Sequence, residues 1–128
     1  MARPPHPGPT ERELLLLQLL WKHGPAPIRD LLDAFPDTPK PAYTSLQTNL
    51  QGMLEKGYIS RDERNRTHIY QARLTQGEVE RDAVQDIVSR VFGGSALRLV
   101  ATALAPETTS EGEIARLQAL LNERKADG

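Results

Sequence analysis

The stretch AYTSLQTNLQGMLEKGYISRDERNRTHIYQA, residues 42–72, decides the fold that this sequence predicts. Its leucines recur at helical spacing up to Gly57, a residue type that commonly ends helices. Residues 58–63 and 67–72 then place β-branched and aromatic side chains on either side of a polar turn, a pattern typical of a β hairpin. The stretch therefore predicts a helix followed by a hairpin.

Two more helices are predicted before this stretch. Thr10 and Glu13 have the spacing of a capping box, which indicates a helix over about residues 10–23, ended by Gly24. Apolar residues at positions i, i+3, i+4 and i+7 between residues 28 and 35 indicate a second, shorter helix. Three helices followed by a hairpin, all within about 75 residues, form the winged helix-turn-helix plan.

Beyond residue 74 the pattern changes to helices without strands. Thr75, Ser95 and Ser110 each precede an amphipathic segment as an N-cap. Three short helices of this kind carry more apolar surface than they can bury alone, so we expect them to pack against a second copy of the chain. The predicted dimerisation residues are Val84, Ile87, Val88, Val91, Leu97, Val100, Leu104, Ile114, Leu117, Leu120 and Leu121.

The predicted fold class is mainly α with a small β hairpin. Residues 1–9 contain four prolines and are expected to form a disordered arm. A winged-helix domain is expected over residues 10–74 and a helical dimerisation domain over residues 75–128. Composition agrees with a folded chain, because 38% of the residues are hydrophobic and only 26% are charged.

Charge and cysteine content limit the classes of function. The net charge is −1, but residues 1–75 hold ten Lys or Arg against eight Asp or Glu, whereas residues 76–128 hold six against nine. A more basic first half is compatible with a nucleic-acid-facing domain.

The absence of cysteine excludes disulfides, thiolate metal sites and thiol nucleophiles. No apolar run approaches the roughly 20 residues that a membrane span needs, and we expect a cytoplasmic protein without membrane insertion.

The helix within residues 42–57 carries a polar face with little charge, opposite its leucines. Gln side chains can read adenine through two hydrogen bonds, and Ser and Thr can contact bases or phosphates, whereas an ordinary solvated face is richer in Glu, Lys and Arg. We therefore predict that this helix enters the major groove of DNA. The predicted base-reading residues are Thr44, Ser45, Gln47, Thr48 and Gln51.

Two segments supply predicted contacts to the DNA backbone. Lys40 and Tyr43 lie at the start of the predicted reading helix, where free backbone amides would meet a phosphate. Arg64 and Arg66 lie in the hairpin turn, which suits phosphate or minor-groove contact. The alternative for these arginines is pairing with the two acidic residues just before Arg64.

No constellation typical of an enzyme is present. The three histidines share no metal-ligand spacing, and no local Ser, His and Asp grouping indicates a nucleophile. Trp21, Phe35 and Tyr70 are predicted to belong to the core. We expect no catalysis, no metal and no cofactor.

Five short motifs follow one another along the chain in a specific order and spacing. They are Glu13–Trp21, Ala42–Ser45 with Leu50, Glu55–Ile59, Val91–Ser95, and Ser110–Ile114 with Leu117, Leu120 and Leu121. Through these motifs the chain resembles the penicillinase-repressor family of winged-helix transcriptional repressors, the BlaI/MecI type, from Thr10 to Lys125. The resemblance implies a homodimer whose reading helices enter successive major grooves of an inverted-repeat operator and repress a promoter until a signal arrives. The family's reading positions fall on the five polar residues given above.

The sequence departs from the family at several points. Gly52 stands where relatives often have a basic residue, and Asn49 stands where they usually have an apolar one. Antibiotic-responsive members are cleaved, under the control of a membrane sensor-protease, at an Asn-Phe pair that aligns with Thr102-Ala103 here. Copper-responsive members carry a cysteine-rich metal motif, which the absence of cysteine excludes for this chain.

Two other functions stay open from the sequence. A winged helix used only for protein interaction is suggested by the near-neutral charge, and it predicts no salt-dependent affinity for DNA. A sensor that binds a small molecule or a metal between the two domains, through a histidine, is the third reading. A ligand that raises the melting temperature would distinguish this sensor from the others.

Overall fold

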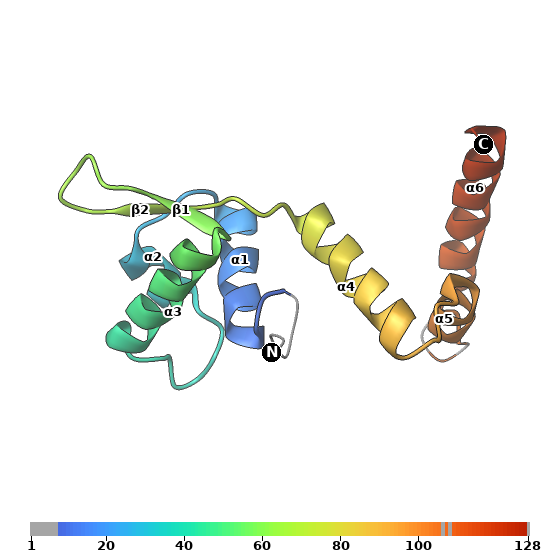
Figure 1. Ribbon diagram of the computed structural model, residues 1–128, viewed down its shortest axis with the longest axis horizontal. Coiled ribbons are helices and arrows are strands. Elements are labelled where there is room, and N and C mark those ends of the chain that lie inside the picture. The colour runs from blue at the N-terminus through green and yellow to red at the C-terminus, as the bar shows by residue number, and fades with distance from the viewer. Residues whose placement is uncertain (1–7, 106, 108, 128) are drawn as a thin grey trace, which may run out of the picture. The chain divides into compact units, whose positions relative to one another are not determined.

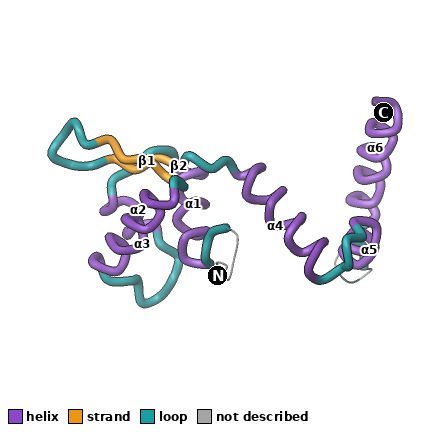
Figure 2. The backbone as a smooth tube through the Cα atoms, in the orientation of Figure 1, coloured by secondary structure: helices purple, strands orange, loops and turns teal. Residues whose placement is uncertain are grey.

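The computed structural model describes residues 8–105, 107 and 109–127, so most of the predicted disordered arm lies outside the described residues. Most of the described residues lie in helices, and the described chain also contains one two-stranded antiparallel sheet (Figures 1 and 2). This confirms the predicted fold class. The elements in chain order are α1 (Glu11–His23), α2 (Ile28–Ala34), α3 (Tyr43–Lys56), β1 (Ile59–Asp62), β2 (Ile69–Ala72), α4 (Gln76–Arg90), α5 (Ala96–Ala103) and α6 (Glu111–Asp127).

The first helix begins at the predicted capping box. The Thr10 hydroxyl accepts a hydrogen bond from the Glu13 backbone N–H at 3.2 Å, and the Glu13 carboxylate accepts one from the Thr10 backbone N–H at 2.9 Å. Two orphan amide groups at the start of α1 are thereby satisfied. Gly24 follows the helix with φ of 84°, in a region of backbone conformation that favours glycine.

The second and third helices end for different reasons. α2 ends at Ala34, and Phe35 takes an extended conformation with ψ of 131°. Proline at the next position disfavours the helical conformation of the residue before it, so the helix stops one residue earlier than the apolar pattern. α3 ends at Gly57, whose φ of 80° and ψ of 14° form a left-handed cap, as the sequence predicted.

The hairpin pairs β1 with β2 in the register Ile59 to Ala72 and Asp62 to Ile69, which leaves a loop over residues 63–68. The other edge of β2 is paired too. The backbone groups of Ala26 and Tyr70 exchange two hydrogen bonds of 3.0 and 2.8 Å. The connector between α1 and α2 therefore fixes the hairpin to the helices.

The hydrophobic core lies between α1, α2, α3 and the base of the hairpin. Phe35 and Tyr70 are buried, as predicted, whereas Trp21 is half-buried at the edge of the core, and its indole Nε1 donates a hydrogen bond of 2.8 Å to the Leu74 carbonyl. The remaining buried apolar residues are Leu16, Leu17, Leu20, Ala26, Leu31, Leu46, Leu50, Met53 and Ile59.

The chain divides after Ala83 into two compact units. We call the described residues up to 83 the head and residues 84–127 the tail. The boundary falls inside α4, because Val79 packs against the core of the head. The head thus contains the three helices and the hairpin together with the first turns of α4.

The later helices begin at the predicted caps. The hydroxyls of Thr75, Ser95 and Ser110 each accept a hydrogen bond from the backbone N–H three residues further on, at 3.0 to 3.2 Å. Yet no described side chain of the tail is buried. Local capping fixes where these helices begin, while their apolar faces stay largely uncovered by the described residues of the tail.

Candidate nucleic-acid interface

The helix α3 separates an apolar face from a polar face. Leu46, Leu50 and Met53 are fully buried in the core of the head, and this burial fixes the rotation of the helix about its axis. The five predicted base-reading residues are exposed on the other side. They are Thr44, Ser45, Gln47, Thr48 and Gln51.

Two of these polar side chains are bonded within the helix. The Thr48 hydroxyl donates to the Thr44 carbonyl at 3.1 Å, and the Gln51 amide donates to the Glu55 carboxylate at 3.4 Å. Within the described part of the chain, Ser45 and Gln47 have no hydrogen-bond partner. Gln47 in particular keeps the full donor and acceptor capacity of its amide group for a ligand.

The helix α3 begins without a side-chain cap, unlike α1, α4, α5 and α6. Its N-cap residue is Ala42, which makes no side-chain cap. Tyr43 follows with 39% of its surface exposed, and the Arg29 guanidinium lies 5.7 Å from the centre of the Tyr43 ring. The Lys40 ammonium group donates to the Asp33 carbonyl, close to the end of α2. Sequence reasoning had not singled out Arg29.

The hairpin carries three arginines, and two of them are paired. Asp62 binds Arg64 through both carboxylate oxygens, at 2.7 and 3.0 Å, and also accepts from the Arg64 backbone N–H at 3.0 Å. These hydrogen bonds lower the pKa of Asp62 from its ordinary value of 3.8 to about 2. Arg61 pairs with Glu63 at 2.8 Å. No described residue pairs with Arg66.

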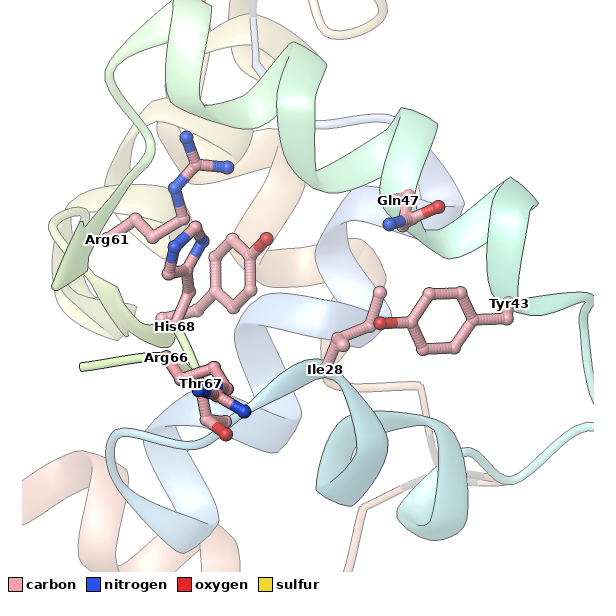
Figure 3. A pocket seen from close by; sticks show the side chains of 8 residues that line it. Ile28, Tyr43, Gln47, Arg61, Arg66, Thr67 and His68 are labelled. Carbon is pink, nitrogen blue, oxygen red and sulfur yellow. The ribbon is translucent and has the colours of Figure 1, made fainter. Parts of the chain in front are cut away.

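An open pocket of about 380 Å³ lies between the start of α2, the first half of α3 and the hairpin (Figure 3). It brings together Tyr43, Gln47 and Arg66, which the sequence predicted as contacts to DNA from two different segments. The other lining residues are Ile28, Arg61, Thr67, His68 and Tyr70. Of these, sequence reasoning missed Arg61, Thr67 and His68 as functional residues, and their only signal was their position next to the predicted turn.

The comparisons with known proteins give the family of the chain. The family model described as penicillinase repressor matches residues 9–123. The chain belongs to the penicillinase repressor family. A penicillinase repressor of Bacillus licheniformis is 21% identical over 119 residues, which cover 93% of each chain. An uncharacterised 16.5 kDa protein of Latilactobacillus sakei is 23% identical over 117 residues, which cover 91% of this chain and 80% of the relative.

Membership confirms the resemblance that the sequence motifs indicated. The family is one of DNA-binding transcriptional repressors and not of enzymes. Within the described ranges, no three His, Asp or Glu side chains gather into a group that could hold a metal ion. No helix among the described residues has both the length and the apolar character needed to cross a membrane.

Two polar side-chain contacts connect α3 with α1. The Lys56 ammonium group lies 2.8 Å from the carboxylate of Glu13, which is 5% exposed. Burial of this carboxyl group opposes its ionisation, but hydrogen bonds from Lys56 and Thr10 outweigh burial and lower the pKa of Glu13. The Arg12 guanidinium group donates to the side-chain amide oxygen Oδ1 of Asn49 at 3.3 Å. This bond gives Asn49, a departure from the family pattern, a partner on α1.

The predicted dimerisation residues carry the apolar surface of the tail. Val91 is 61% exposed and Leu97 is 79% exposed. Val84, Ile87, Val100, Ile114, Leu120 and Leu121 are also exposed, while Val88, Leu104 and Leu117 are half-buried. A monomeric soluble protein rarely leaves so many large apolar side chains uncovered.

Proposed function

We propose that this member of the penicillinase repressor family binds an inverted-repeat operator as a homodimer and represses the adjacent promoter. The observation that carries the proposal is the polar, weakly charged face of α3, which is exposed while the opposite face is locked into the core. A rigid helix with this face can enter a major groove without reorganising the head.

Within the groove, the five exposed polar residues of α3 read base edges. Gln47 is the strongest candidate, because its amide is uncommitted and can form two hydrogen bonds to adenine. Thr44 and Thr48 present methyl groups that suit contact with thymine. Ser45 and Gln51 complete the set.

The DNA backbone is contacted from both sides of this helix. Lys40 and Tyr43 lie at its start, where the backbone amides lack a side-chain cap. Arg64 and Arg66 approach from the hairpin. Arg66 has no partner among the described residues, whereas Arg64 must exchange Asp62 for a phosphate. The Arg64 side chain is 87% exposed, so water screens its ion pair, and the exchange replaces one charge-assisted pair by another.

The tail brings two heads together. Its helices bury no described side chain by themselves, although each carries large apolar residues. A second copy of the chain offers the same apolar faces in a two-fold arrangement, which buries both sets at once. Two linked heads then bind two half-sites about one helical turn apart, and the linkage raises the affinity by avidity.

The signal that ends repression is assigned by the resemblance alone. A membrane sensor-protease system is the partner that we propose, and Thr102-Ala103 stands at the aligned bond in place of the Asn-Phe pair of the cleaved members. Both residues are exposed in the last turn of α5. Mass spectrometry of the protein from induced cells tests this partner, and an intact chain under full induction would contradict it.

The experiment for the main proposal is binding of the purified protein to the DNA upstream of its own gene at two salt concentrations. Footprinting and light scattering are measured on the same sample. We expect a dimer that protects an inverted repeat, with an affinity that falls steeply with salt. A monomer without protection or salt dependence would favour a protein-interaction module instead.

A further inference from the structure

We propose that the pocket between α3 and the hairpin seats one backbone phosphate of each operator half-site. Arg66 and His68 bind it from the hairpin and Tyr43 binds it from α3 (Figure 3). This inference deepens the proposed function and rests on it. It adds His68, a residue that neither the sequence motifs nor the base-reading face assign to DNA.

The lining of the pocket has the chemistry of an anion site. It contains two guanidinium groups, an imidazole, three hydroxyls and one amide, and no carboxylate is among its lining residues. The acidic residues of the hairpin are engaged elsewhere, because Asp62 binds Arg64 and Glu63 binds Arg61. A phosphate in the pocket therefore meets hydrogen-bond donors from lining residues that include no carboxylate, and the one carboxylate bound to a lining group is Glu63 on Arg61 among the described contacts.

The positive charge of the pocket is available to a ligand. Arg61 is already neutralised by Glu63 at 2.8 Å. Arg66 and His68 have no partner in the described part of the chain, so neither must break an existing bond to bind an oxygen. Their side chains lie on the hairpin side of the pocket, while Tyr43 and Gln47 come from α3 (Figure 3).

The size and position of the pocket also fit a backbone phosphate. About 380 Å³ corresponds to a dozen water molecules at roughly 30 Å³ each, enough for a phosphate with part of its sugar. Gln47 lines the same pocket and belongs to the base-reading face. A phosphate held there fixes the register of α3, because backbone contacts position a protein while base contacts specify the sequence.

The test is a scan of the operator with methylphosphonate groups, each of which replaces a single charged phosphate by a neutral one. Affinities are measured for the wild-type dimer, Arg66→Ala and His68→Ala. We expect one phosphate per half-site whose neutralisation weakens the wild type about tenfold but weakens the two variants much less. Arg66→Ala should also lower the salt slope by about one unit per head.

Two further variants serve as controls. His23→Ala changes an exposed histidine at the end of α1 and should respond to the scan like the wild type. Arg66→Lys keeps the charge and should retain most of the sensitivity at the same phosphate. Thermal melts are recorded for every variant to check that its head is folded.

The outcomes separate this inference from the proposed function. Operator protection by the wild type, with the same methylphosphonate losses in Arg66→Ala and His68→Ala, would overturn the phosphate seat alone. Absence of any operator protection by the wild type would overturn the repressor proposal and the seat with it.

Discussion

At the end of β1, Asp62 binds the guanidinium group of Arg64 with both carboxylate oxygens and so sets how much positive charge the hairpin presents. Arg61 is paired with Glu63, which contacts it through a single carboxylate oxygen. Arg66 is left as the arginine without a partner among the described residues of the hairpin. The sequence had offered pairing as an alternative for Arg64 and Arg66, and the structure pairs Arg64 but not Arg66.

The Asp62 carboxyl group should titrate with a midpoint of about 2 in the free protein, below its ordinary value of 3.8. A lowered pKa means that the pair is complete above pH 3.8 and is lost as the pH falls through about 2. Carboxyl-carbon NMR measures the midpoint directly. Arg64→Ala should return it close to 3.8, and a wild-type midpoint already at that value would contradict the pairing.

Gln47→Ala and Arg64→Ala should change DNA binding in different ways. Loss of Gln47 should relax the preference for one base pair at a cost of about 1–3 kcal/mol on the cognate site, because a base contact is lost. Loss of Arg64 should weaken all sequences alike and lower the salt slope by about one unit, because a phosphate contact is lost. Competition binding on mutated operators measures both effects, and equal behaviour of the two variants would refute these roles.

At the scale of elements, α3 is bound to α1 by an ion pair and a side-chain hydrogen bond. The capping box of α1 uses the same Glu13 carboxylate that binds Lys56 at the end of α3. One buried carboxylate therefore joins the start of the first helix to the end of the reading helix.

Lys56→Met should lower the free energy of unfolding by about 1–2 kcal/mol. The substitution leaves the Glu13 carboxylate buried without its cation, and the loss is smaller than for a fully buried pair because the Lys56 side chain is 46% exposed. The pKa of Glu13 is lowered, so the contribution of the pair is present above pH 4.5 and is lost as the pH falls through the lowered value.

Urea unfolding at neutral and at acidic pH measures this difference. Lys22→Met is the matched control, because Lys22 is exposed at the end of α1 and should change stability by less than about 0.5 kcal/mol. A loss for Lys56→Met that is the same at both pH values would show that packing, and not the ion pair, is responsible.

A second test at this scale concerns the end of the head. A fragment that ends at Ala83 should be more stable than one that ends at Leu74 by about 1 kcal/mol, since Val79 packs against the core. Thermal melts of the two fragments measure the difference. Equal melting temperatures would move the boundary of the head back to the start of α4.

On the scale of the whole molecule, the head and the tail are stabilised differently. Every fully buried apolar side chain among the described residues belongs to the head. The tail helices have N-caps, but no described side chain of the tail is buried. If the tail gains its stability from the proposed association with a second copy, folding of the tail and dimerisation should occur together.

Leu97→Glu should convert the dimer into a monomer and weaken operator binding by at least tenfold, because a charge would replace an apolar side chain in the interface. Light scattering and operator titration measure the two effects. Ala119→Glu adds the same charge at an exposed position on the side of α6 opposite to Ile114, Leu117 and Leu121, and should leave the dimer intact. A dimeric Leu97→Glu protein would show that this residue lies outside the interface.

What the sequence by itself determined about this protein is its set of elements and their ends. Thr10, Ser95 and Ser110 cap helices, and Gly57 ends α3, because capping joins groups within a few residues of each other and its chemistry is legible in the sequence. The exposed polar face of α3 followed from the same periodicity. The family followed from the order of these motifs.

Only the tertiary structure decided which distant residues meet. The pocket joins Gln47 to His68, and the Glu13–Lys56 pair joins two helix ends that are 43 residues apart in the chain. That Arg66 has no partner among the described residues followed from the geometry of the hairpin. Such contacts depend on how the core packs the elements against one another. The hydrophobic effect that drives this packing is not directional, so a local sequence pattern shows which face of an element is buried but not which element it packs against.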